Sequence, residues 1–193
     1  LGASLWGVFA LGDWPGVTNK IIGFTALLVI LIGARMTVWK ETQESQYSKN
    51  LKRAVILLLI GEIGYWAYSA APQATDIGGM QAFLPQAMGM VIVAVVYALM
   101  NLKHQNAFTE SVSWKQIISG FFFAFAALTY LISAQPDMNG LATGFVLSQT
   151  SVVLATLTGI YFLKQKKTPK ELVITIIGLV LILAAATVTV FIK

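Results

Sequence analysis

Long apolar runs separated by short polar segments dominate the chain. Six of the runs reach the length of about 20 residues that a helix needs to cross a bilayer. They extend over residues 17–39, 54–71, 79–102, 116–134, 140–163 and 172–192. An earlier run, residues 1–11, is too short to cross, and Asp13-Trp14-Pro15-Gly16 after it is typical of a turn between two helices. The pattern predicts an all-α, polytopic membrane helix bundle.

Composition narrows the classes of function. Hydrophobic residues make up 57% of the 193 residues and charged residues 11%, against about 25% charged in an average soluble domain. The sequence has no Cys, and His104 is its only His, which excludes disulfides, thiol chemistry and multi-His metal centres. It also has no phosphate-binding Gly-rich loop and no Ser/His/acid set. We therefore expect no enzyme, no cofactor, no metal and no nucleic-acid partner.

Two stretches of the sequence look alike. Residues 5–11 resemble residues 157–163, and residues 21–23 match residues 176–178, about 150 residues further along in each case. Chance similarity between helices rich in Leu, Ile and Gly is the alternative explanation. If the similarity is a repeat, each copy holds five helices.

The repeat divides the chain into three parts. Residues 1–39 are then the end of a first repeat, with a partial fourth helix and the fifth helix, and residues 40–53 are a cytoplasmic linker. Residues 54–193 form a complete second repeat. On this interpretation the sequence is truncated at its N-terminus, since the front of the first repeat is absent.

Basic residues alternate from loop to loop. The loops at residues 40–53, 103–115 and 164–170 hold four, two and four Lys or Arg residues. The intervening loops hold one at most, and they carry Asp13, Asp76 and Asp137. Because short cytoplasmic loops collect Lys and Arg, the basic loops are predicted to be cytoplasmic. Two copies of five helices then face opposite ways, which is the inverted repeat found around the midplane substrate site of many transporters.

Glu62 is the one acid inside a predicted span, in Ile60-Gly61-Glu62-Ile63-Gly64. Ionisable residues inside membranes are costly, and many of them relay protons. A carboxyl group that exchanges a proton near neutral pH is what a proton-coupled carrier needs. Glu62 is therefore a candidate for proton coupling. The alternative is a buried Glu that only holds helices together.

Two amides lie within apolar helices. Gln86 follows Pro85, which removes a backbone donor, and Gln149 follows Ser148 near the middle of a span. Amides and hydroxyl groups offer the donors and acceptors that bind sugar hydroxyls. Gln86, Gln149 and Ser148 are therefore candidate substrate-binding residues. The alternative for each is a hydrogen bond between helices, worth roughly 1 kcal/mol.

Aromatic side chains supply the other half of a sugar site. Trp66 and Tyr130 lie in two of the predicted spans and are candidates for stacking on the apolar face of a sugar. Aromatic residues that face lipid are the alternative. A mixture of aromatic rings and neutral hydrogen-bonding groups fits an uncharged, hydroxylated substrate.

Several tracts resemble a known family. They are Phe-Leu-Pro-Gln-Ala-Met-Gly-Met at residues 83–90, Gly-Phe-Val-Leu-Ser-Gln at 144–149 and Leu-Thr-Gly-Ile at 157–160. These tracts resemble bacterial glucose uptake proteins of the glucose/ribose porter family, in the drug/metabolite transporter superfamily, over essentially the whole chain. The resemblance implies ten helices in two inverted halves, with this chain beginning in the fourth helix. It also implies import of glucose or ribose with protons.

The resemblance places Gln86, Ser148 and Gln149 on the family tracts, whereas Glu62 lies outside them. The sequence therefore predicts a multi-pass sugar permease of the bacterial inner membrane that works by alternating access. Its partners are the bilayer and a small sugar, and a homodimer stays open. The alternative is an exporter of the same superfamily that uses Glu62 as a cation and proton site. A membrane scaffold without transport is a third hypothesis.

Overall fold

The predicted helical fold is confirmed in a computed structural model, which describes residues 2–41, 49–103 and 106–192. Helices dominate this part of the chain, and it contains no strand. The helices are α1 (Gly2–Phe9), α2 (Val17–Thr37), α3 (Lys49–Ala74), α4 (Gly79–Met100), α5 (Ser111–Lys115), α6 (Ile117–Ser133), α7 (Gly140–Ser148), α8 (Ser151–Tyr161) and α9 (Pro169–Val190). His104 and most of the predicted linker, residues 42–48, lie outside the described residues.

Six segments are long and apolar enough to cross a membrane, at the six places that the sequence predicts. Two details differ from the expectation. The predicted span at residues 140–163 is interrupted between α7 and α8. Helix α3 continues through Pro72 to Ala74, so the following loop is shorter than predicted.

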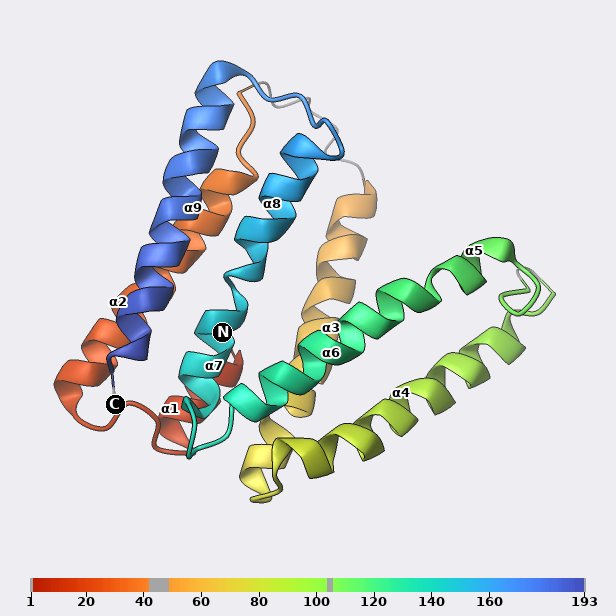
Figure 1. Cartoon of the computed structure of the whole chain (residues 1–193), viewed down its shortest axis with the longest axis horizontal. Coiled ribbons are helices and arrows are strands. Elements are labelled where there is room, and N and C mark those ends of the chain that lie inside the picture. Colours follow the sequence, from red (N-terminus) through yellow and green to blue (C-terminus); the bar gives the residue numbers. More distant parts are fainter. Residues whose placement is uncertain (1, 42–48, 104–105, 193) are drawn as a thin grey trace.

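Helices α2 and α9 lie side by side and run in opposite directions (Figure 1). Their backbones meet at two glycines. A Cβ atom on Gly33 would lie 2.7 Å from the carbonyl oxygen of Gly178, and one on Gly178 would lie 2.6 Å from that of Gly33. Small residues at a crossing allow such close approach. We call this contact the seam.

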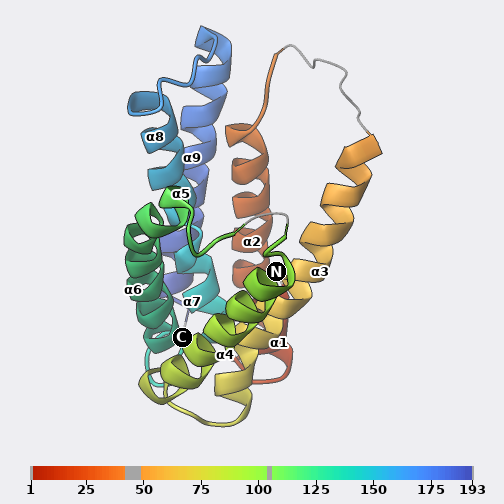
Figure 2. The same cartoon turned by 90° about the vertical axis from the view of Figure 1, so that its right-hand side faces the viewer.

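Helix α1 packs against α7 and α3, and the main buried cluster lies between α1, α2, α7 and α9. Val8, Ile30, Val146 and Ala186 are buried there. Helices α4 and α6 pack on each other away from this cluster, and α3 diverges from α2 toward the end where α3 begins (Figures 1 and 2). We call α4 and α6 the arm. Its side chains are mostly apolar and exposed, as lipid contact requires.

The loops alternate between the two ends of the bundle. Helices α2, α4 and α8 finish toward the upper end of Figure 1, where the basic loops follow them. Asp13, Asp76 and Asp137 follow helices that finish at the lower end. The antiparallel course of α2 and α9, whose residues 21–23 and 176–178 match, has the geometry that an inverted repeat requires. The repeat and the cytoplasmic side of the basic loops stay predictions.

Asp13 ties the turn before α2 to the start of α7. Its Oδ2 accepts a hydrogen bond of 2.7 Å from the backbone N–H of Ala142. The neighbouring Trp14 donates from Nε1 to Thr143 Oγ1 at 2.9 Å. An anion is stabilised at a helix N-terminus, where backbone N–H groups lack partners. Burial raises the pKa of Asp13 above its usual value, although the N–H groups of Ala142 and Leu141 oppose that shift.

A second polar contact ties the end of α2 to the start of α9. Lys167 Nζ donates to the carbonyl oxygen of Thr37 and to Thr175 Oγ1, both at 2.8 Å. The backbone N–H of Glu41 donates to Glu171 Oε1 at 2.9 Å. A cation at the C-terminus of a helix satisfies carbonyls that have no partner in the helix. The first contact thus places an anion on a helix start, and the second a cation on a helix end.

Candidate functional site

The interruption between α7 and α8 is a local change of hydrogen bonding. The N–H groups of Gln149 and Thr150 donate to Val146 and Leu147, both at 3.1 Å, three residues back instead of four. The Phe145 carbonyl thereby loses its usual partner, the N–H of Gln149. Ser148 Oγ donates to this carbonyl at 2.6 Å. Residues 148–151 read Ser-Gln-Thr-Ser, and such side chains compete with the backbone for hydrogen bonds.

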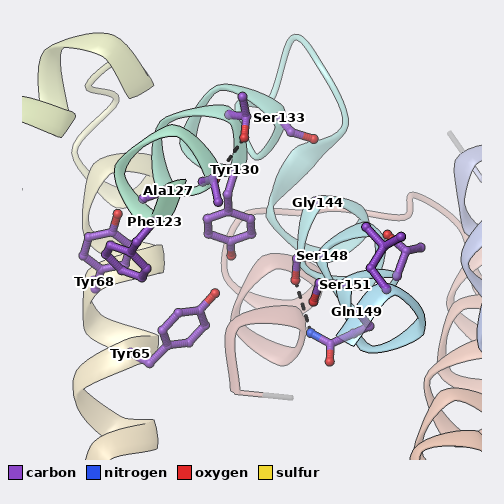
Figure 3. Close-up of a pocket in the computed structure, with 14 residues that line it drawn as sticks. Tyr65, Tyr68, Phe123, Ala127, Tyr130, Ser133, Gly144, Ser148, Gln149 and Ser151 are labelled. Atoms are coloured by element: carbon purple, nitrogen blue, oxygen red, sulfur yellow. Dashed lines mark hydrogen bonds between the residues drawn. The ribbon is translucent and has the colours of Figure 1, made fainter. Parts of the chain in front are cut away.

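A cavity of about 630 Å³ lies between this break and the helices α3 and α6 (Figure 3). We call it the tyrosine cavity. Its walls are Tyr65, Tyr68, Phe123, Ala126, Ala127, Thr129, Tyr130, Ser133, Gly144, Ser148, Gln149, Thr150, Ser151 and Leu154. Its volume lies within the range of about 300–1,000 Å³ that small-molecule sites occupy. Discontinuous membrane helices form the substrate sites of many transporters.

Three tyrosines form the aromatic wall. The ring of Tyr65 stacks with that of Tyr68 at 6.2 Å between centroids and with that of Tyr130 at 6.4 Å. The hydroxyl groups of Tyr65 and Tyr130 point toward the space in front of Ser148 and Gln149 (Figure 3). The Tyr68 and Tyr130 hydroxyl groups are buried and have no hydrogen-bond partner within the described residues. Buried polar groups need a partner, and a hydroxylated ligand would provide one.

Three of the predicted site residues therefore meet at one cavity: Gln149, Ser148 and Tyr130. Tyr65 and Tyr68 line it too, although the sequence interpretation selected their neighbour Trp66. The three-residue spacing of Tyr65 and Tyr68 places both on one face of α3, and this spacing is the signal that could have found them.

Trp66 lies outside the tyrosine cavity. It points toward α1, where its ring stands edge-on to that of Trp6 at 5.5 Å between centroids. A Cβ atom on Gly2 would also touch the Trp66 ring, at 3.5 Å. Residues next to each other on a helix point about 100° apart, which turns Trp66 away from the face of Tyr65. The structure places Trp66 in the contact between α1 and α3.

Gln86 also lies outside the cavity walls. Its Nε2 donates to the carbonyl oxygen of Tyr68 on α3 at 2.9 Å. In an uninterrupted helix that carbonyl would accept from the residue four positions later, which is Pro72 and has no N–H. Gln86 therefore supplies the donor that Pro72 lacks. In this structure the amide has the helix-joining role that was the alternative to substrate binding.

Glu62 lines a second cavity, of about 460 Å³, on the other side of the break. We call it the Glu62 cavity. Its remaining walls are Gly2, Leu27, Ile30, Leu31, Val55, Leu58, Leu59, Phe145 and Gln149. Nearly all of these side chains are apolar. A carboxyl group in such surroundings is a candidate functional group in a membrane protein, and the role of Glu62 stays a prediction.

A helical bundle with six candidate spans, one of them interrupted beside a cavity of rings and hydroxyl groups, defines a polytopic membrane protein. The chain belongs to the family described as Sugar transport protein, whose model matches residues 1–192. The predicted resemblance to sugar porters is thereby confirmed, and the family is one of transporters and not of enzymes.

Named relatives agree with the family. The chain is 83% identical over 193 residues to a Staphylococcus epidermidis protein named "Putative ribose uptake protein RbsU". It is 79% identical over the same length to a Staphylococcus aureus protein of that name. These alignments cover 100% of this chain and 66% of each relative, so the chain spans about two thirds of their length. No solved structure matches. The predicted multi-pass bacterial membrane location is confirmed by the family and the six spans.

Proposed function

We propose that the protein takes up ribose, or a similarly small and uncharged sugar, across the bacterial membrane. The observation that carries this proposal is the tyrosine cavity, where the buried Tyr130 hydroxyl group, which has no hydrogen-bond partner within the described residues, faces the Ser148 and Gln149 side chains (Figure 3). Tyrosine rings stack on the apolar face of a sugar, while hydroxyl and amide groups bond its rim. The ribose uptake names of the relatives support a pentose. Glucose stays the second candidate sugar.

We propose alternating access as the mode of transport. The cavity lies at a break within a span, and α2 and α9 run antiparallel as the equivalent helices of an inverted repeat would. In transporters of that design, one repeat moves against the other around a midplane site. Proton coupling through Glu62 completes the proposal, since its carboxyl group lies in an apolar cavity next to the break.

Uptake of radiolabelled ribose and glucose by the full-length protein tests the substrate. We expect ribose uptake in cells that lack other ribose transporters, and a rise in the half-saturating concentration of roughly tenfold for Tyr130→Phe, which removes one hydroxyl group. Tyr97→Phe is the matched control, because Tyr97 is 69% exposed on the arm. Equal uptake by both variants and the parent would show that the tyrosine cavity does not bind the substrate.

Export of an amphipathic cation is the second candidate, favoured by the single carboxyl group on the walls of the apolar Glu62 cavity. Efflux of such a compound that collapses in Glu62→Gln, in a protein that takes up neither ribose nor glucose, would replace the sugar proposal.

A further inference from the structure

The tyrosine cavity and the Glu62 cavity meet at one side chain. Gln149 is the residue that lines both of them within the described part of the chain. It lies at the break between α7 and α8, where the backbone bonds three residues back. Gln149 therefore shares one cavity with the residues of the proposed sugar site and the other with Glu62.

The Glu62 cavity offers few competing charges. Its described walls come from α1, α2, α3 and α7 with the adjoining break, and Glu62 is the one ionisable side chain among them. The nearest titratable group on the same helix is Tyr65, which interacts electrostatically with Glu62 and lines the tyrosine cavity. Among these walls, Gln149 has the one side chain that can donate a hydrogen bond to a charge on Glu62.

The amide of Gln149 is held loosely. Its Nε2 lies 3.2 Å from Ser148 Oγ and 3.4 Å from the Phe145 carbonyl oxygen, both long for hydrogen bonds. Ser148 Oγ donates to the same carbonyl at 2.6 Å. If the Gln149 amide turns away, the Phe145 carbonyl keeps that short bond. The side chain can therefore move without leaving a backbone acceptor unpaired.

We propose that Gln149 couples the charge of Glu62 to sugar binding, an inference that rests on the proposed sugar uptake. When Glu62 is ionised, its carboxylate attracts the Gln149 N–H groups into the Glu62 cavity, and the sugar site loses a donor. When Glu62 binds a proton, the amide returns to the tyrosine cavity and bonds a sugar hydroxyl. A proton and a sugar then favour each other's binding, as uptake with protons requires.

The test is the pH dependence of ribose affinity in the purified full-length protein. We expect the dissociation constant to be about tenfold lower at the lowest than at the highest pH at which the protein stays folded. Glu62→Gln removes the charge, and Gln149→Met removes the amide at similar length, so each should abolish that ratio. Tyr130→Phe is the matched control because Tyr130 lines the tyrosine cavity but not the Glu62 cavity, and the Gln149 amide is bonded to Ser148 and Phe145 instead. It should weaken binding but keep the parental ratio.

The results separate this inference from the proposed function. A Gln149→Met protein that binds ribose with the parental pH ratio overturns the inference and leaves sugar uptake intact. A parent whose ribose affinity does not change with pH overturns it too. If Gln149→Met binds too weakly to measure, Gln149→Asn decides, because its shorter amide should bind ribose without the pH ratio. A parent that neither binds nor transports ribose or glucose overturns the proposed function itself.

Discussion

The helices of the seam and those of the arm are held in place by different kinds of contact. At the seam, Gly33 and Gly178 bring two backbones together with no room for a side chain. On the arm, an alanine in place of Gly89 or Gly120 would have its Cβ in open space, with no described atom beyond the adjoining stretch of its own helix within 4 Å. The arm is joined to α3 by the hydrogen bond from Gln86. The inner bundle is held by close packing along α2 and α9, whereas α4 approaches the α6 backbone closely at its first residue, Gly79, and bonds to α3 through Gln86.

The seam should respond most strongly to added volume. Gly178→Ala would place a Cβ atom 2.6 Å from the Gly33 carbonyl oxygen and force α2 and α9 apart, so we expect a loss of about 3 kcal/mol of stability. Gly89→Ala on the arm is the matched control. Because alanine has the better helix propensity, the stability of this variant should be equal to or slightly above that of the parent. Thermal unfolding of both variants in detergent measures the difference. Similar midpoints would remove the contrast between seam and arm.

Removal of the Asp13 carboxylate should have the next largest effect. Asp13→Ala leaves the first N–H groups of α7 without their acceptor, and a lost cap of this kind costs about 2 kcal/mol. Asp137→Ala is the control, since Asp137 is exposed in a loop at the same end of the bundle. The free energies of unfolding of the two variants give the measurement, and an equal loss would argue against the cap.

Gln86→Met should destabilise the joint between α3 and the arm by about 1 kcal/mol, because it leaves the Tyr68 carbonyl without a donor. Pro72→Ala sharpens the test by returning a backbone N–H four residues after Tyr68. In that background, Gln86→Met should cost much less. A double-mutant cycle measures the coupling, and additive losses would show that Gln86 does not compensate for Pro72.

The smallest effect is the pH dependence that Asp13 contributes. Its pKa is raised in the folded protein, so the folded state holds its proton more tightly than the unfolded state. The associated stability is present below the unfolded pKa of 3.8 and is lost as pH rises through the folded value. Asp13→Asn keeps an acceptor but cannot ionise, and should flatten this decline. A decline of equal slope in the variant would assign the effect to other groups.

The sequence predicts the spans well because burial in lipid demands about 20 apolar residues whatever the tertiary packing. The break at Gln149 was missed because the residues on both sides are apolar enough to continue the run. Ser-Gln-Thr-Ser in mid-span was the available signal. Gln149, Ser148 and Tyr130, which line one cavity, could be selected as candidates from the sequence because polar groups in mid-membrane are few.

The positions of Trp66 and Gln86 could not be predicted in the same way. Trp66 points to α1 because α1 is the helix that packs on that face of α3. The hydrophobicity of a helix face does not specify which other helix will pack on it. The Gln86 amide on α4 donates to the Tyr68 carbonyl oxygen on α3, which Pro72 leaves without a backbone donor. Asp13 was predicted only as a loop acid, although it caps α7 from 129 positions away. Each role depends on helix pairing that a single sequence does not specify.

The cap at α7 has a consequence for hydration. The carboxylate of Asp13 and the first N–H groups of α7 satisfy each other across the junction between the turn before α2 and the second half of the chain. Any motion that separates these elements leaves both the Asp13 carboxylate and the α7 N–H groups without a partner. Away from the protein, water is what can satisfy them. A motion of that kind would therefore draw water to this end of the bundle.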